Sequence, residues 1–443
     1  MSRSDGTIAE MPHDAPSPGG RIRLSSALDL AARLLYRISG VRGVRLAAFA
    51  GSLRRMRDTI GTIDLLIAAE AAEPVMNGVA GLPLVARVLT REPAKTSVVT
   101  AAGVRVDVRV VEPAGWGGAL LYCTGSKSHT IELRELAARA SLELTEHGLF
   151  DARTGKLIVS ETEEEVYERL GLPWIPPTLR EGTGEVEAAL EGRLPRLVEL
   201  TDIRGDLHTH TDLTDGVAGL EEMVAAAEAH RYEYYAITDH AALLATERMA
   251  GEKVLKQRKR IRELERTEGV ALLHGTEVTI QPDGTLDWDE AFLSTFDIVV
   301  ASVHSGFHQP REQMTARLLR AIEHPCVHII GHPSARVIGS RPPIDLDYDA
   351  VFRAAARTGT ALEINALPAR LDLTGELVRR ARHFGVRFAI STDAHAVPHL
   401  DHLRFGVATA QRGWAGPQDV INAYPLSLLR RFLTAKSSTL SRR

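Results

Sequence analysis

After residue 200 the chain repeats one hydrophobic pattern, in which short β-rich apolar runs alternate with longer amphipathic stretches. The predicted strands are Ile203–Leu207, Tyr234–Thr238, Ala271–Gly275, Ile298–Val303, Val327–Gly331, Thr360–Ile364 and Val386–Ser391. Intervening stretches such as Leu220–His230 and Gln309–Ile322 are long enough for one helix each. Seven such units in succession predict a parallel α/β barrel.

Earlier in the chain, apolar and polar residues alternate with a period of two, which is typical of half-buried strands. Every second residue of 104–110 is valine, so Arg105 and Asp107 share the opposite face. The same pattern places Thr62 and Asp64 on one side of a neighbouring strand. We therefore expect a smaller α+β domain with carboxylates on its polar face.

A proline-bearing, acidic stretch from Leu172 to Leu200 separates these two patterns and is interpreted as a linker with one short helix. The expected organisation is a disordered tail at 1–20, an α+β domain at 21–174, the linker at 175–200 and the barrel at 201–443.

The composition narrows the functional classes. Only two cysteines are present, Cys123 and Cys326, which argues against a disulfide framework and suits a reducing compartment. No apolar run approaches the roughly 18 residues of a membrane span, and the start lacks the apolar core of a signal peptide, so we expect a cytoplasmic protein without a membrane partner. The net charge of −4 gives no general attraction for nucleic acid, so DNA contacts would need local basic patches such as Arg54, Arg55 and Arg57.

Histidines are concentrated in the predicted barrel, since fourteen of the 17 follow residue 200. Some of these histidines directly follow predicted strands, and two carboxylates have the same placement. Together they are His208, His210, His240, Glu277, His304, His332, Asp393 and His395. Six of the seven strands carry such a residue at the carboxyl end, the face on which barrel active sites are built. A lone histidine there is usually a satisfied polar residue, but the joint pattern predicts a metal site.

Imidazole and carboxylate donors together suit Zn, Mn or Fe better than Mg or Ca. So many donors exceed the needs of one ion and favour a cluster, which would clamp a phosphate and lower the pKa of a bridging water. The nucleophile would then be metal-bound hydroxide. The remaining histidines of the barrel, including His230, His274, His308, His324, His328 and His383, are interpreted as structural or solvated.

The motifs GDLHTHTDLTDG, AITDHA, HGTEV, ASVHSGF, IIGHPSAR and STDAHA resemble those of the PHP (polymerase and histidinol phosphatase) domain over nearly all of residues 203–443. The resemblance implies a distorted (β/α)7 barrel with three divalent ions. Its implied ligands are His208, His210, Asp215, His240, Glu277, His304, His332, Asp393 and His395. Asp215 and Glu277 also belong to the expected catalytic set, with Arg336 and Arg370 as contacts of the substrate phosphate.

Residues from about Gly40 to Trp174 resemble the palm and thumb of bacterial family X DNA polymerases, through FAGSLRRMRDTIGTIDLLIA, GVRVDVRVV, LLYCTGSKSHTIELRELA and LTEHGLF. The resemblance implies that Ser52 and Arg55 bind a nucleoside triphosphate. It also implies that a turn around Tyr122, Thr124 and Gly125 lines the sugar pocket.

The expected polymerase site departs from the family pattern, because Thr62 occupies the position of the first catalytic aspartate. Only Asp64 and Asp107 remain on the shared face, and a neutral threonine cannot replace a bridging carboxylate. About forty residues precede the palm, too few for the helical DNA-binding domain and fingers, so we expect an amino-terminally truncated form with a vestigial nucleotide site.

The leading hypothesis is a metal-dependent phosphodiesterase, a 3′-5′ exonuclease acting on DNA ends in repair, with the palm holding DNA or a deoxynucleoside triphosphate. One alternative is a repair polymerase that retains nucleotidyl transfer. Others are a small-molecule phosphomonoesterase and a binding module with an inactive barrel, although the intact donor set speaks against the last.

Overall fold

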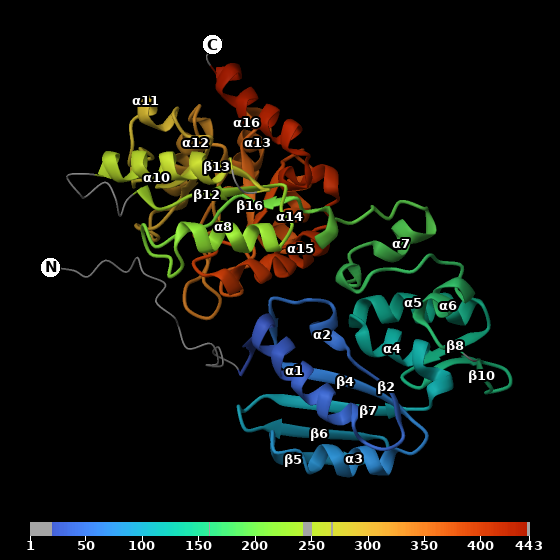
Figure 1. Cartoon of the computed structure of the whole chain (residues 1–443). Coiled ribbons are helices and arrows are strands. Elements are labelled where there is room, and N and C mark those ends of the chain that lie inside the picture. Colours follow the sequence, from blue (N-terminus) through green and yellow to red (C-terminus); the bar gives the residue numbers. More distant parts are fainter. Residues whose placement is uncertain (1–19, 159, 242–249, 267–268, 441–443) are drawn as a thin grey trace. The chain divides into compact units, whose positions relative to one another are not determined.

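The chain divides after Leu194 into two compact units in this computed structural model, which describes residues 20–158, 160–241, 250–266 and 269–440 (Figure 1). Nearly all of the predicted amino-terminal tail lies outside the described residues. No helix in these ranges is long and apolar enough to cross a membrane. The unit that ends at Leu194 is called the first unit below, and the other is called the barrel unit.

The barrel unit contains seven parallel strands in sequence order, as predicted. They are β11 (Gly205–Asp206), β12 (Tyr234–Ile237), β13 (Ala271–Thr279), β14 (Ile298–Ser302), β15 (Ile329–Ile330), β16 (Ala361–Asn365) and β17 (Phe388–Ser391). The first and last strands meet through a parallel bridge between Thr209 and Ala394, and Asn422 Nδ2 donates to the Gly205 carbonyl at 2.8 Å. The sheet is therefore nearly closed.

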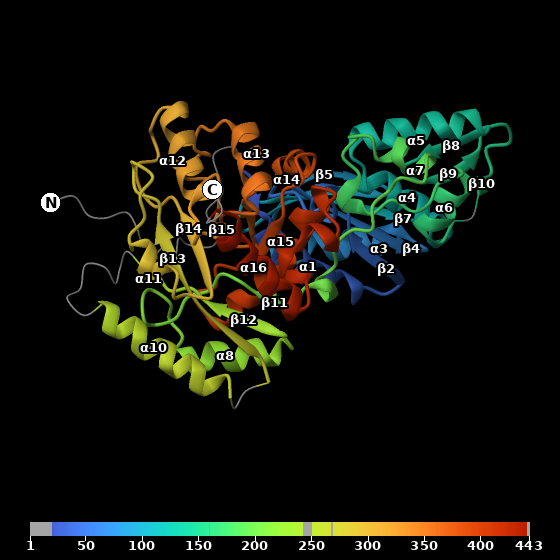
Figure 2. The same ribbon diagram turned by 90° about the horizontal axis from the view of Figure 1, so that it is seen from above.

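Helices surround this sheet, as Figures 1 and 2 show. They are α8 (Leu220–Ala229), α10 (Ala250–Leu264), α11 (Glu290–Leu293), α12 (Arg311–Glu323), α13 (Tyr348–Thr358), α14 (Gly375–Arg382) and α15 (Leu403–Arg412). Their apolar faces and the outward side chains of the strands form one continuous buried core. Burial of both sheet faces explains why the strands appear in the sequence as continuous apolar runs.

A second, smaller core fills the barrel interior and includes the final helix α16 (Leu426–Leu440). Leu429 and Leu433 of α16 pack with inward residues such as Leu207 and Ile329. The buried amino group of Lys436 donates to the carbonyls of Ile322 and Val327 and to the Thr360 hydroxyl. This helix is consequently part of the barrel core.

The first unit contains a five-stranded sheet in the order β2-β4-β7-β6-β5. The bounds are β2 (Val44–Phe49), β4 (Thr62–Ala69), β5 (Val85–Glu92), β6 (Lys95–Thr100) and β7 (Arg105–Val111), with α1 (Leu24–Ser39) and α3 (Ala72–Ala80) packed against the sheet. Strands β4 and β7 are parallel, and their register places Asp64 opposite Asp107. The predicted pairing of these two carboxylates on one face is confirmed.

A helical part follows the sheet within the same unit. It contains α4 (Trp116–Thr124), α5 (Lys127–Arg139), α6 (Glu163–Arg169) and the small sheet β8 (Leu142–Thr145), β9 (Gly148–Asp151) and β10 (Leu157–Ile158). The range predicted as a linker is folded into this part up to Leu194. The division between the two units falls directly after that residue.

Buried charged side chains hold the range that was predicted as a linker in its folded position. Arg180 is fully buried and binds both oxygens of Glu163, at 2.6 and 2.9 Å, and Glu163 also receives two hydrogen bonds from Arg54. Glu185 of α7 (Glu185–Leu190) lies 2.8 Å from His129 Nδ1. Because these partners are distant in sequence, the composition of the range gave no sign of them.

Candidate metal centre

The nine predicted metal donors converge at the carboxyl ends of the barrel strands. Three groups of donor atoms lie within 4.8 Å of one another: His210, Asp215, His240 and His395; His208, His210 and Asp393; and His240, Glu277 and His304. His332 joins them, since its Nε2 is 3.2 Å from Glu277 Oε1. Residues separated by most of the barrel sequence therefore share one site.

Glu277, which β13 delivers to the barrel axis, is the centre of this site. Its Oε2 is 2.8 Å from His240 Nδ1 and 3.4 Å from His208 Nε2. Its Oε1 is 3.2 Å from His304 Nε2. One carboxylate thus faces imidazole donors from several strands, and it would hold metal ions together with them.

Two further carboxylates flank Glu277. Asp393 Oδ1 is 3.2 Å from His210 Nε2, and Asp215 Oδ2 is 3.4 Å from the Nε2 atoms of both His240 and His395. Asp393 adopts φ +54°, a left-handed conformation that is uncommon for residues other than glycine. Strained backbone of this kind is concentrated at functional sites, where the surrounding structure holds it in place.

The donor atoms at the centre lack ordinary partners. By hydrogen-bond geometry, His208 Nε2, both ring nitrogens of His210 and both carboxylate oxygens of Glu277 are buried without a partner among the described residues. Such atoms normally cost free energy of folding, because their hydration is lost and not replaced. Bound divalent ions would satisfy His208 Nε2, the Glu277 oxygens and one ring nitrogen of His210, and the mixed nitrogen and oxygen donors fit Zn, Mn or Fe. The residues present therefore fit a metal cluster.

The electrostatics of the site favour cations. Burial would raise the pKa of Glu277, but the neighbouring imidazoles hold it well below its usual range. Burial would lower the pKa of His240, but Glu277 and Asp215 raise it to about 10. Below that pH the imidazole holds a proton that a metal ion must displace.

We accordingly expect the apparent affinity for Mn²⁺ or Zn²⁺ to increase with pH, by about tenfold per pH unit for each displaced proton. Titration calorimetry in two buffers of different protonation enthalpy would count the protons released. His240→Ala should release about one proton fewer than the wild type. Equal heats in both buffers would contradict the expectation.

Strand β16 supplies a supporting layer that the sequence interpretation missed. Glu363 Oε1 is 2.7 Å from His208 Nδ1, and its Oε2 accepts the His332 backbone N–H at 2.6 Å. Asn365 Nδ2 donates both to Glu363 and to Asp393. Partners of this kind orient metal ligands and fix their tautomers. The available signal was a carboxylate and an amide in an otherwise apolar strand.

Asp239 supports the opposite side of the site. This buried carboxylate accepts hydrogen bonds from the Thr211 hydroxyl at 2.7 Å, the Thr214 hydroxyl at 2.8 Å and the Gln257 side chain. Thr214 immediately precedes Asp215, so the network holds the loop that carries this donor.

The two predicted phosphate-binding arginines lie in different environments. Arg370 is 5% exposed, its Nε is 3.6 Å from Asp393 Oδ2, and its Nε and Nη1 make no hydrogen bond within the described ranges. Arg336 donates from Nε to the Arg370 carbonyl at 2.8 Å and from Nη2 to the Leu371 carbonyl. Arg336 therefore positions the loop of Arg370, and a phosphate contact by either residue stays a prediction.

The predicted polymerase carboxylates lie in the first unit. Burial and the charge of Asp107 raise the pKa of Asp64 to about 6. Asp107 is paired with Arg105 at 2.9 Å, and Thr62 lies opposite Arg105 on the neighbouring strand. The two carboxylates are thus adjacent, and one of them is engaged by an arginine.

The other predicted nucleotide-binding residues are partly engaged within the protein. Arg55 pairs with Glu181 at 3.1 Å and donates to the Thr124 carbonyl, while the buried Thr124 hydroxyl accepts from Arg54 at 2.7 Å. Ser52 lies in the short helix α2 (Gly51–Arg54), Tyr122 is half-buried, and Gly125 has φ +52°. A nucleotide phosphate would have to compete with Glu181 for Arg55.

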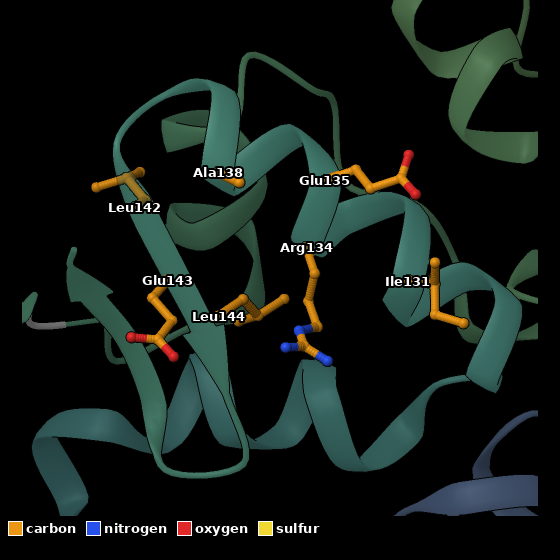
Figure 3. Close-up of a pocket in the computed structure, with 7 residues that line it drawn as sticks. All are labelled: Ile131, Arg134, Glu135, Ala138, Leu142, Glu143 and Leu144. Carbon is orange, nitrogen blue, oxygen red and sulfur yellow. The ribbon is translucent and has the colours of Figure 1, made fainter.

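An open pocket of about 300 Å³ also lies in the first unit (Figure 3). It is lined by Ile131, Arg134, Glu135, Ala138, Leu142, Glu143 and Leu144. None of the predicted site residues belongs to this lining.

Two parts of the chain match known families. Residues 119–181 match the DNA polymerase beta thumb, and residues 206–366 match the PHP domain. The latter range includes most of the metal donors, together with Glu363 and Asn365.

Similar proteins extend the likeness to the whole chain. A protein of Bacillus subtilis (strain 168) named DNA polymerase/3′-5′ exonuclease PolX is 36% identical over 97% of this chain and 76% of its own length. A protein of Thermoanaerobacter sp. (strain X514) named probable phosphatase is 32% identical over 43% of this chain and 78% of its own length. A probable phosphatase of Shewanella sediminis is 28% identical over 51% of this chain and 91% of its own length. The chain belongs to the bacterial family X DNA polymerases that carry a PHP domain.

Proposed function

We propose that the barrel unit is a metal-dependent phosphodiesterase that removes nucleotides from the 3′ ends of DNA. The observation that carries this proposal is the convergence of nine imidazole and carboxylate donors around Glu277. The name of the Bacillus subtilis relative includes a 3′-5′ exonuclease, which supports DNA as the substrate.

Each group of residues has a proposed role. The nine donors would hold three divalent ions, of Mn or Zn, or Fe. Bound ions supply Lewis-acid stabilisation of the phosphoryl oxygens and lower the pKa of a coordinated water. Glu363 and Asn365 hold His208, His332 and Asp393 in place. The Arg370 guanidinium would bind a non-bridging phosphate oxygen, because its buried Nε and Nη1 need an acceptor.

The test uses 3′-labelled and 5′-labelled oligonucleotides with Mn²⁺. We expect the wild type to shorten DNA from the 3′ end and His208→Ala to have no such activity, because His208 contributes a central donor. The matched control is His383→Ala, which removes an exposed imidazole at the end of α14. Shortening that persists in His208→Ala, or none in the wild type, would overturn the proposal.

A second candidate is a phosphomonoesterase, which the names of the Thermoanaerobacter and Shewanella relatives favour. Both activities would use the same donors, so substrate comparison has to separate them. Hydrolysis of p-nitrophenyl phosphate without any shortening of oligonucleotides would favour the phosphomonoesterase.

Nucleotidyl transfer by the first unit would need a carboxylate at residue 62, which is a threonine. We expect the wild type to extend no primer, because Asp64 and Asp107 alone provide too few carboxylates for two ions. Thr62→Asp should restore detectable Mn²⁺-dependent extension, since residue 62 lies on the same face as Asp64.

Gel assays with a primer, a template and deoxynucleoside triphosphates would measure this, with His208→Ala in the background to suppress degradation. Thr90→Asp, at an exposed strand position, is the control. If Thr62→Asp also fails to extend, the site has lost more than one ligand.

A further inference from the structure

Arg341 lies at the rim of the metal face, between two loops that carry donors. Its guanidinium stacks on the Phe307 ring, 3.9 Å from the centroid, and its Nε donates to the Ala335 carbonyl at 2.7 Å. Phe307 follows His304 by three residues, and Ala335 follows His332 by three. Both loops leave the carboxyl ends of their strands, so Arg341 is held on the same face as the cluster.

No carboxylate in the described ranges forms an ion pair with this side chain, although the buried Asp372 lies near enough to attract it. Its terminal nitrogens make no hydrogen bond there, and no carboxylate comes within ion-pair distance of them. Burial, together with the positive charge of Arg370, lowers the pKa of Arg341 to about 10, against the opposing effect of the Asp372 carboxylate. Two cationic groups are thus kept close together at the edge of the metal centre.

The unsatisfied atoms of Arg370 are an independent sign of an anionic ligand here. Its Nε and Nη1 are buried without hydrogen-bond partners, whereas the Arg336 guanidinium beside it binds backbone carbonyls. Asp393 Oδ2 lies 3.6 Å from Arg370 Nε without forming a hydrogen bond, which leaves both unsatisfied nitrogens of Arg370 to a ligand anion. The planar guanidinium is suited to phosphate, which it can bind through two parallel hydrogen bonds.

We propose that Arg341, stacked on Phe307, is a specificity-determining residue that binds a second phosphate of a polynucleotide, one nucleotide away from the bond that is hydrolysed. This inference rests on the proposed phosphodiesterase function and narrows its substrate class to esters with at least two phosphates. Phe307 fixes the guanidinium plane and leaves the edge with the terminal nitrogens available. Phosphomonoesters and single-phosphate diesters would not reach this residue.

The first measurement compares two substrates. For Arg341→Ala we expect KM for a short oligonucleotide to increase about tenfold, as for a lost charged hydrogen bond. Hydrolysis of bis-p-nitrophenyl phosphate, which has one phosphate, should change less than about twofold. Arg341→Lys keeps the charge but loses the planar fork, so its KM for the oligonucleotide should lie between those of the wild type and Arg341→Ala. The matched control is Arg353→Ala. Arg353 is an exposed arginine of α13 that lies over the Phe384 ring.

The second measurement does not depend on catalysis. Fluorescence anisotropy of a labelled oligonucleotide in EDTA should show about tenfold weaker binding to Arg341→Ala and unchanged binding to Arg353→Ala. Equal effects of Arg341→Ala on both esters, or unchanged binding, would overturn the inference. If the wild type hydrolyses neither ester, the proposed function fails, and the anisotropy result still decides the role of Arg341.

Discussion

Replacing Glu277 by glutamine is expected to reduce phosphodiester hydrolysis by at least about 10³-fold, because correctly held ions supply several kcal/mol of transition-state stabilisation. The substitution preserves size but removes the charge that faces His208, His240 and His304. A neutral amide would hold divalent ions less well than this carboxylate, so we expect the ions to be lost or displaced.

Metal content by mass spectrometry and hydrolysis of end-labelled DNA measure this expectation together. Glu363→Gln is the informative comparison, since this carboxylate touches His208 without facing the centre. It should reduce metal affinity or activity by about 10- to 100-fold, as for other partners of metal ligands. Full metal content and near-normal hydrolysis in Glu277→Gln would exclude this carboxylate from the site.

Glu163→Ala is expected to destabilise the first unit by about 3–5 kcal/mol, because it leaves the fully buried Arg180 without its carboxylate. Arg54 and the indole of Trp174 would lose the same partner. Glu164→Ala is the matched control, since Glu164 is the exposed neighbour of Glu163 on the same helix. Hydrogen exchange of the full-length protein would report loss of protection in peptides that cover residues 163–190.

The stability of the first unit should also depend on pH through the Glu163 carboxylate. Burial would raise the pKa of Glu163, but hydrogen bonds from Arg180 and Arg54 lower it from 4.5 to about 2. Because the folded-state pKa is depressed, this stabilisation is present above about pH 4.5 and is lost as the pH falls towards 2. Protection factors, taken relative to the intrinsic exchange rate at each pH, that stay constant across this range would contradict a charged Glu163 in the folded unit.

Periodicity and position explain what the sequence could predict. The seven strands were recognisable because burial on both faces leaves uninterrupted apolar runs, and donors at their ends had to converge because parallel strands share one carboxyl edge. The hydrogen bonds of two other histidines also agree with the interpretation: His274 accepts from Arg258, and His328 accepts from the Val299 N–H.

Pairings between distant residues were not predictable. The roles of Glu363 and Arg336 depend on contacts with loops of other strands, which no local pattern encodes. For the same reason residues 175–194 were interpreted as a linker, although Arg180 and Glu185 bind partners from α6 and α5. Local composition describes how a segment would behave alone, and here tertiary contacts determine its structure.

The hydrogen bond between Asn422 and Gly205 has a kinetic consequence, because these residues are separated by 217 positions in the chain. Contacts of such long range form slowly, since loop closure must precede any favourable contact. The metal donors that follow β11 and β17 meet only when this closure is complete. The backbone N–H of Asp393 then donates to the His208 carbonyl. Metal ions added during refolding should therefore leave the folding rate nearly unchanged and slow only the unfolding of the finished barrel.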